Sequence, residues 1–382
     1  MFATKSIFQR EILPRTNVAF ARIRSSSYTS SSNAENPAGA GYGNVHDQML
    51  PPSQEECNRM FKHTQRPKTV SVIGAPMTFG QPYSGTDFGP QLLREEGLLE
   101  SLKSIGWRIH DHGNLDFKQI SQNSDINHTA EMPGAKNSTI VGKGCEMVAH
   151  AVAESLKNNQ FPLILGGDHS IGAGTLAGLL SVNPNTGVIW VDAHADLNTP
   201  TLSESGNMHG MPVGLMMKGI AQDPSKIPGF EWMGNPNMSN RLDPDSIVYI
   251  GLRDIDLSER RILRENNIKV FTMFDVDNLG IGKVMKSAIG HLLKKDANRP
   301  IHVSYDIDAC DPLEAPATGT AVRGGLTYRE AHFVAEAVAR SGSLASAEIV
   351  ELNPTLSDEN GSKETVELGH GILTSLMGKT II

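Results

Sequence analysis

Three apolar segments of the chain each run into residues whose side chains bind metal ions. The segments are 161–165, 187–191 and 301–305, and the six candidate ligands that follow them are His169, Asp192, His194, Asp196, Asp306 and Asp308. In extended backbone, side chains at positions i, i+2 and i+4 share one face, so those after each segment can converge on a cation. Carboxylates and imidazoles without a thiolate suit Mn²⁺, Fe²⁺ or Zn²⁺, and the oxygen-rich majority favours manganese.

Four carboxylates gathered in one place would repel one another, and their pKa values would rise strongly without compensating positive charge. A pair of divalent cations removes this repulsion, and two metal ions that share a water activate it for hydrolysis. Each residue alone could have a structural role instead of binding metal, because an Asp after a strand often caps the next helix and a His is often a core side chain. Their joint occurrence after three segments therefore indicates a metal site.

The segments that carry these residues belong to a regular alternation of apolar and amphipathic stretches. Strands are expected at 70–74, 161–165, 187–191, 246–251, 268–272, 301–305 and 347–352, and helices at 90–104, 143–157, 257–265, 276–293, 328–341 and 364–377. Near-continuous apolar strands separated by helices predict an α/β/α fold, with one parallel sheet covered on both faces. Ligands bind such sheets outside the carboxyl ends of the strands, where the candidate ligands lie. The stretches 115–137 and 222–240 are expected to be surface loops.

The overall composition excludes several classes of partner. The chain of 382 residues has 39% hydrophobic and 20% charged residues and a formal net charge of −8. This charge argues against a nonspecific nucleic-acid partner or an acidic membrane surface. No apolar run approaches the roughly 18 residues that a membrane helix needs. We therefore expect no nucleic acid and no membrane among the partners.

The N-terminal segment 1–34 has a different character from the remainder. It holds five basic residues and one acidic residue and ends in a Ser-rich stretch. This composition is typical of a mitochondrial transit peptide and predicts the mitochondrial matrix, with an uncleaved basic tail and a cytoplasmic location as the alternatives. Residues 35–68 are polar and rich in Gly, Pro and Asn, so a flexible linker is expected there. The catalytic domain is expected to span 69–382.

A series of short motifs resembles those of the ureohydrolases, and among them the arginase family most closely. The motifs are GGDHS at 166–170, DAHADLNTP at 192–200, SGNMHGMPV at 205–213, SYDID at 304–308, APATGT at 315–320 and ELNP at 351–354. The resemblance implies a three-layer α/β/α fold with a mainly parallel eight-stranded sheet. It also implies two Mn²⁺ per subunit, hydrolysis of L-arginine to L-ornithine and urea, and a homotrimer or homohexamer.

The same resemblance implies a role for each matching residue. One manganese would be held by His169, Asp192, Asp196 and Asp306, and the other by Asp192, His194, Asp306 and Asp308. A metal-bridging hydroxide, oriented by Asp196, would attack the guanidinium carbon. His209 would shuttle a proton to the leaving amine, and an imidazole that titrates near neutrality suits this work. Glu351 would pair with the guanidinium in a planar two-point contact, beside the Thr320 hydroxyl.

The far end of the pocket would distinguish arginine from its decarboxylated relative agmatine. The resemblance assigns Asn198, Ser205 and Asn207 to substrate binding, the first two at the α-carboxylate, and Asp256 to the α-amino group. A site built around such hydrogen bonds rejects a substrate that lacks the group. Arginine is therefore favoured, and agmatinase or another guanidino hydrolase is the main alternative.

Two further classes lie outside the guanidino hydrolases: a single-zinc deacetylase of the same general fold and a noncatalytic protein. Both are disfavoured because the sequence retains every expected metal ligand. It also retains His209 and Glu351. Two departures from the arginase pattern remain, Ser203 where Thr is usual and Ala321 where Pro is usual. The three cysteines show no CxxC spacing, and Cys310 is expected to be a small buried apolar residue, with a redox-sensitive thiol as the alternative.

Overall fold

The computed structural model describes residues 69–117, 119–120, 132–220 and 223–380. Within these residues, eight strands form one sheet in which every neighbouring pair is parallel. The order across the sheet is β2-β1-β3-β8-β7-β4-β5-β6. The eight-stranded, mainly parallel sheet expected from the family resemblance is thus confirmed. The predicted transit peptide and linker lie outside the described residues.

The central strands are buried on both faces, which explains their near-continuous apolar sequences. The strands are β1 (Thr69–Ala75), β2 (Arg108–Asn114), β3 (Phe161–Gly166), β4 (Gly187–Val191), β5 (Ile247–Leu252), β6 (Lys269–Thr272), β7 (Ile301–Asp306) and β8 (Leu344–Val350). Every residue of β3, β4, β5, β7 and β8 is buried. Parallel sheets require this cover because their crossover helices lie on the faces.

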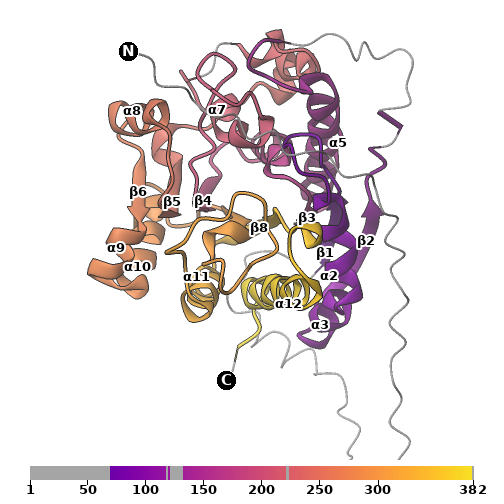
Figure 1. Ribbon diagram of the computed structural model, residues 1–382, viewed down its shortest axis with the longest axis vertical. Coiled ribbons are helices and arrows are strands. Elements are labelled where there is room, and N and C mark those ends of the chain that lie inside the picture. Colours follow the sequence, from indigo (N-terminus) through magenta and orange to yellow (C-terminus); the bar gives the residue numbers. More distant parts are fainter. Residues whose placement is uncertain (1–68, 118, 121–131, 221–222, 381–382) are drawn as a thin grey trace, which may run out of the picture. The chain divides into compact units, whose positions relative to one another are not determined.

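Helices cover the sheet in two layers, each with its own apolar core. One core joins the sheet to α2 (Gly89–Glu95), α3 (Leu98–Ser104), α9 (Met273–Leu279), α10 (Ile281–Leu293), α11 (Tyr328–Arg340) and α12 (Glu359–Leu376). The other joins it to α5 (Ser138–Lys157), α6 (Gly172–Val182), α7 (Pro212–Met216) and α8 (Leu257–Glu265). Figure 1 shows α5 and α7 on one side of the strands and α11 and α12 on the other.

The structure corrects several predicted elements. Strand β2 was not predicted, because this edge strand is largely exposed and its sequence RIHDHGN has no apolar run. The helix predicted at 90–104 is two helices, since Gly97 between them has a φ of 88°. The helix predicted at 276–293 is likewise divided, at Gly280 with a φ of 77°. Left-handed backbone of this kind interrupts an α-helix and favours glycine.

Two further stretches differ from the predicted pattern. Helix α6, for which no element was predicted, follows the short loop that carries His169 and is almost entirely buried, so it lacks the polar face by which a surface helix is recognised. The stretch 222–240, expected to be a surface loop, contains short 3-10 helices that place Phe230, Met233 and Met238 in the core over α5 and α6. Part of the loop expected at 115–137 lies outside the described residues.

The sheet order brings the candidate ligands together. Strands β3 and β4 follow one another in sequence, yet β8 and β7 lie between them in the sheet. The carboxyl ends of these four strands therefore form one continuous edge, and ligands of parallel α/β sheets bind at such an edge. No helix among the described residues has the length and apolarity needed to cross a membrane.

Candidate metal centre

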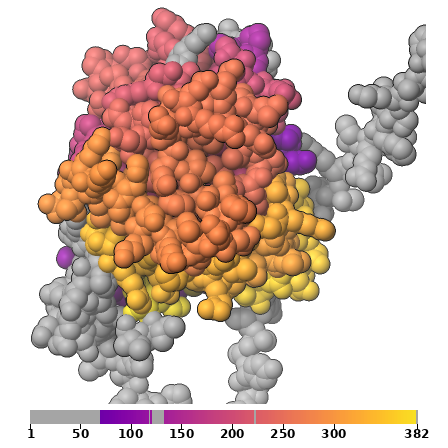
Figure 2. All heavy atoms as spheres, turned by 90° about the vertical axis from the view of Figure 1, so that its left-hand side faces the viewer, coloured from indigo at the N-terminus to yellow at the C-terminus, as the bar shows by residue number. Residues whose placement is uncertain are grey.

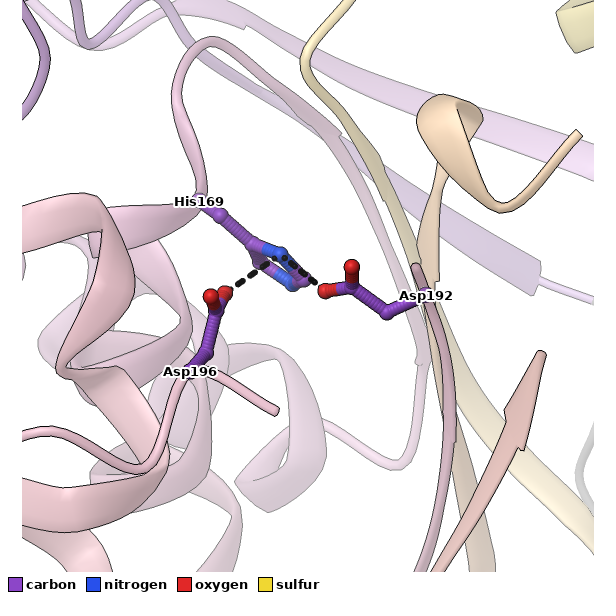
Figure 3. Close-up of side chains that lie close together, drawn as sticks. All are labelled: His169, Asp192 and Asp196. Carbon is purple, nitrogen blue, oxygen red and sulfur yellow. Dashed lines mark ion pairs between the residues drawn. The ribbon is translucent and has the colours of Figure 1, made fainter. Parts of the chain in front are cut away.

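The His169 imidazole faces three carboxylates at the carboxyl end of the sheet. Its Nδ1 atom lies 3.2 Å from Asp192 Oδ2, 3.0 Å from Asp196 Oδ2 and 3.1 Å from Asp306 Oδ2. These groups come from the loop after β3, from the loop after β4 and from the last residue of β7. Figure 3 shows His169 between Asp192 and Asp196, with both carboxylates directed toward the ring.

A second cluster lies beside the first and shares one residue with it. His194 Nδ1 is 3.4 Å from Asp192 Oδ1 and 3.0 Å from Asp308 Oδ2. The Asp192 carboxylate thus directs one oxygen to each histidine. His169, Asp192 and Asp196 form one group with ligand atoms close enough to hold a metal ion, and Asp192, His194 and Asp308 form the other. The structure therefore brings all six predicted ligands together.

The surroundings of His169 fit a bound cation. Its Nε2 atom lies 2.8 Å from Ser304 Oγ, and its ring stacks on Trp190 at a centroid distance of 4.2 Å. Its Nδ1 atom is buried and has no hydrogen-bond partner. When Nε2 donates its hydrogen to Ser304, the Nδ1 lone pair is directed at three carboxylate oxygens, which also carry lone pairs. A metal ion between them would satisfy all four atoms.

Two of the carboxylates, Asp306 and Asp196, indicate excess negative charge. Burial raises the pKa of Asp306 well above its usual value, and the neighbouring Asp308 and Asp192 raise it further. Burial and the Asp192 charge raise the pKa of Asp196 to about 6. Divalent cations would remove this repulsion and keep the carboxylates ionised.

Two residues of the site have strained backbone. Asp196 has a φ of 49° and Glu351 a φ of 66°, a region that residues other than glycine seldom adopt. The Asp196 carbonyl accepts hydrogen bonds from the amides of Val213 and Gly214, and the Glu351 amide donates to the Gly167 carbonyl at 2.8 Å. Such strain persists where the surrounding structure imposes it and is common at functional sites.

His209 pairs with Glu351 next to the metal cluster. His209 Nδ1 is 3.4 Å from Glu351 Oε1, which also accepts the His169 backbone amide at 2.8 Å. Burial lowers the pKa of His209, but the Glu351 carboxylate outweighs this effect and raises it to about 9. Burial opposes ionisation of Glu351, whereas His209 holds the pKa of this carboxyl below its usual value. The pair is therefore a carboxylate and an imidazolium at neutral pH.

The predicted substrate residues fall into separate groups. Asn198 and Asp256 are in contact, because Asn198 Nδ2 donates to Asp256 Oδ2 at 2.9 Å. Ser205 is exposed farther along the loop that carries Asn198, and its Oγ accepts the Asn207 amide at 3.2 Å. Thr320 donates to Asp308 Oδ2 at 2.9 Å, so it supports a candidate metal ligand.

Several polar residues of the site were not predicted. Asp168 is buried and accepts the backbone amides of Gly80 and Ser170, and Gln81 donates to Glu351 Oε2 at 2.5 Å. Asp168 belongs to the GGDHS motif, so the motif itself was the available signal. Gln81 lies after β1 in a segment without a recognised motif, and only the fold brings it to Glu351.

Cys310 is buried, as expected, and its thiol is poorly suited to redox chemistry. Burial raises its pKa to about 12, and Tyr305 Oη lies 3.9 Å from its sulfur. Reactive cysteines instead have a lowered pKa and access to solvent.

A family model described as "Arginase family" matches residues 68–378. The chain belongs to the arginase family. Among curated members, human Arginase-1 is 45% identical over 289 residues, which cover 76% of this chain and 86% of the relative. The arginase of Glaciozyma antarctica (strain PI12) is 42% identical over 316 residues, covering 83% and 89%.

Solved structures of arginase-family members have the same fold. The arginase of Bacillus caldovelox aligns with a TM-score of 0.72 and 38% identity, covering 83% of this chain and all of the other. The arginase of Bacillus subtilis aligns with a TM-score of 0.70 and 37% identity, covering 82% and 100%. The family resemblance carried by the sequence motifs is thus confirmed.

Proposed function

We propose that this arginase-family protein hydrolyses L-arginine to L-ornithine and urea with two Mn²⁺ per subunit. The observation that carries the proposal is the sharing of Asp192 between two buried His/Asp groups, next to the His209–Glu351 pair. Relatives that bear the name arginase, at 42–45% identity, support the reaction.

The six ligands divide between two ions. His169, Asp192, Asp196 and Asp306 would hold one, and Asp192, His194, Asp306 and Asp308 the other. The donor set of four carboxylates and two imidazoles, without a thiolate, favours manganese among the divalent ions. When bound, the pair supplies Lewis acidity and lowers the pKa of water toward neutrality.

The protein side chains position the substrate and move the proton. Glu351 is ionised and buried, so its carboxylate can pair with a guanidinium, which is planar and carries five N–H donors. Asp196 accepts a hydrogen bond from the attacking water and orients it. His209 Nδ1 faces Glu351, so Nε2 is the atom that would protonate the departing ornithine amine.

The contact between Asn198 and Asp256 supports arginine as the substrate. The Asp256 carboxylate would pair with the α-ammonium group, while the Asn198 amide and the Ser205 hydroxyl would donate to the α-carboxylate. Agmatine lacks the α-carboxylate and would leave these donors without partners, which disfavours its binding.

The direct test is urea release by the purified full-length protein, loaded with Mn²⁺, from L-arginine and from agmatine in parallel. We expect turnover of arginine that a chelator abolishes and Mn²⁺ restores, with little turnover of agmatine. Preference for agmatine would contradict the substrate assignment and leave the metal site intact. Absence of urea release from both substrates would contradict the proposed reaction.

We further propose that the protein is a homo-oligomer, a trimer or hexamer. Apolar side chains are exposed at the β6 edge of the sheet, where Leu257 is 83% and Phe274 75% exposed. Figure 2 looks onto this edge, where the segment containing α8, α9 and α10 forms much of the surface. A groove beside Phe274 is lined by Leu263, Val270 and Met273, which adds apolar surface.

Light scattering coupled to size-exclusion chromatography tests the assembly. We expect a trimer or hexamer for the wild-type protein and smaller species for Phe274→Asp. The control is Leu313→Asp, at a residue that is 88% exposed and does not line the groove. A wild-type monomer would contradict the proposal.

Residues 1–34 are proposed to direct the protein to the mitochondrial matrix. Their basic, Ser-rich composition supports this role. A fusion of residues 1–34 to a fluorescent protein is expected to enter mitochondria, and replacement of its five basic residues by Gln should keep the fusion in the cytoplasm. Cytoplasmic retention of the unmodified fusion would favour the alternative location.

A further inference from the structure

Gln81 is a buried amide that contacts the proposed guanidinium-binding carboxylate. It lies in the loop after β1, and its side chain is 7% exposed. Its Nε2 atom donates to Glu351 Oε2 at 2.5 Å, whereas Glu351 Oε1 accepts the His169 amide and faces His209. Gln81 is therefore one of the groups that fix the orientation of this carboxylate.

The other end of the Gln81 amide has no partner. An ionised carboxylate only accepts hydrogen bonds, so the Gln81 atom that faces Glu351 must be the NH₂ group. This assignment directs Oε1 away from Glu351, and Oε1 is buried without a hydrogen-bond partner. A buried carbonyl oxygen without a donor is unfavourable, so this atom is suited to receive an N–H group from a ligand.

A glycine lies next to this oxygen. A Cβ atom at Gly319 would lie 3.0 Å from Gln81 Oε1 and 3.8 Å from the Tyr83 ring. Gly319 precedes Thr320, whose hydroxyl donates to the candidate metal ligand Asp308. The unpartnered oxygen therefore faces the loop that borders the metal centre.

The loop that carries Gln81 is held firmly in place. The Gly80 amide donates to Asp168 Oδ2 at 2.8 Å, and the Gly80 carbonyl accepts the His209 amide at 3.1 Å. Farther along, Thr355 donates to the Ser84 carbonyl at 2.9 Å. A Cβ at Gly80 would lie 2.5 Å from Asp168 Oδ1, so glycine permits this close approach. Gln81 is thus positioned before any ligand binds, which lowers the entropic cost of recognition.

We propose that Gln81 is a specificity residue that recognises the amidino group of the substrate. Its Oε1 atom would accept one N–H of that group while its Nε2 atom donates to Glu351. This inference rests on the proposed function and extends it. The Glu351 carboxylate and Gln81 Oε1, at the other end of the bridging amide, would each accept an N–H group of a guanidinium. A primary amine such as that of ornithine has no planar set of N–H donors to match them.

The test compares wild-type protein with Gln81→Met, an apolar side chain of similar length. With the full-length, Mn²⁺-loaded protein, we expect kcat/KM for L-arginine to fall about 10- to 100-fold. The inhibition constant of L-ornithine, which lacks the amidino group, should stay within about twofold. The matched control is Gln91→Met, because Gln91 makes the same type of hydrogen bond, to Glu95 at 2.8 Å, on the exposed surface of α2.

A binding measurement separates this inference from the proposed reaction. Methylguanidine is titrated calorimetrically into both proteins, and we expect binding to wild-type protein that is weakened at least about tenfold in Gln81→Met. This result would support the inference even if wild-type protein released no urea from arginine. Absence of methylguanidine binding to the wild type, or equal binding to both, would overturn it.

A second substitution tests the surroundings of Gln81 Oε1 without changing Gln81 itself. Gly319→Ala places a methyl group beside Oε1, and we expect it to raise KM for arginine while the ornithine inhibition constant is retained. A parallel change in both constants for Gln81→Met, or an unchanged KM for arginine in both variants, would show a structural role only and would overturn the proposal.

Discussion

The Asn198 side-chain amide donates a hydrogen bond of 2.9 Å to the Asp256 carboxylate, although 58 positions separate the two residues in the chain. Asn198 follows the candidate metal ligands after β4, whereas Asp256 immediately precedes α8. The Asp256 backbone amide in turn donates to Glu259 Oε2 at 3.0 Å, which fixes the start of that helix. Asn198, proposed to bind the α-carboxylate, and Asp256, proposed to bind the α-ammonium group, therefore hold each other in position.

Substitution of Asp256 should relax substrate selection. We expect Asp256→Ala to lower kcat/KM for L-arginine about 10- to 100-fold, because the α-ammonium group loses its carboxylate and Asn198 loses its partner. Steady-state urea release from both substrates checks this, since the ratio of arginine to agmatine activity should fall. The control is Asp254→Ala, an exposed carboxylate in the same loop. An unchanged ratio in Asp256→Ala would contradict the assignment.

Ser304 should control metal affinity through the orientation of His169. Its hydroxyl contacts His169 Nε2 at 2.8 Å, which leaves Nδ1 free for a metal ion. Loss of such a supporting hydrogen bond costs about 10- to 100-fold in metal affinity. We expect this loss in Ser304→Ala, measured by titration of metal-free protein with Mn²⁺.

A matched control exists on the neighbouring strand. Ser346 Oγ contacts His302 Nδ1 at 2.9 Å, and both residues are buried in the same way as Ser304. Ser346 and His302 lie outside the candidate metal ligands. Ser346→Ala should therefore retain the wild-type Mn²⁺ affinity, and an equal loss in both variants would indicate a general packing effect.

Removal of one negative charge from the metal cluster should change the thermal midpoint of unfolding in opposite directions in the presence and absence of metal. Burial, Asp308 and Asp192 raise the pKa of Asp306, so keeping this carboxylate ionised at neutral pH destabilises the metal-free fold. This loss of stability grows as pH increases above the unfolded pKa of about 3.9. We expect Asp306→Asn to raise the thermal midpoint of metal-free protein.

With Mn²⁺ present, the same substitution should lower the midpoint relative to wild type, because a metal ligand is lost. Calorimetric or fluorescence-monitored unfolding with and without chelator provides both measurements. Asp254→Asn, at an exposed position, should change neither midpoint appreciably. A decrease in both conditions for Asp306→Asn would contradict charge repulsion in the metal-free site.

The His209–Glu351 pair should make the stability of the metal-free protein depend on pH. The folded pKa of His209, about 9, lies above the unfolded value of roughly 6.5. The protonated pair therefore stabilises the fold fully below about pH 6.5, and this contribution is lost as pH rises through about 9. Its size is on the order of 3 kcal/mol, because each pKa unit between roughly 6.5 and about 9 corresponds to about 1.4 kcal/mol.

The difference in unfolding free energy between wild type and His209→Asn measures this contribution. We expect it to decrease between pH 6.5 and 9.5. The control is His150→Asn, at an exposed position on α5. A constant difference for His209→Asn would exclude the proposed ionic pairing with Glu351.

Much of the fold follows from short-range patterns in the sequence. Buried parallel strands carry continuous apolar residues, so the strands that end at the ligands were predicted from residues alone. Edge strand β2 was not, because only one neighbour and one partly covered face constrain its side chains. The breaks at Gly97 and Gly280 were also missed, because a glycine inside a helical pattern does not reveal its φ angle.

The sequence by itself determined the ligand types, their spacing after the strands and the family, since local periodicity and motifs carry this information. Only the tertiary structure decided that Asp192 directs one oxygen to each histidine, that Asn198 contacts Asp256, and that Gln81 reaches Glu351. These contacts join residues whose approach depends on the strand order, and Gln81 and Glu351 are 270 positions apart. Spacing along a chain fixes which side chains share a face, whereas the order of strands in the sheet fixes which faces meet.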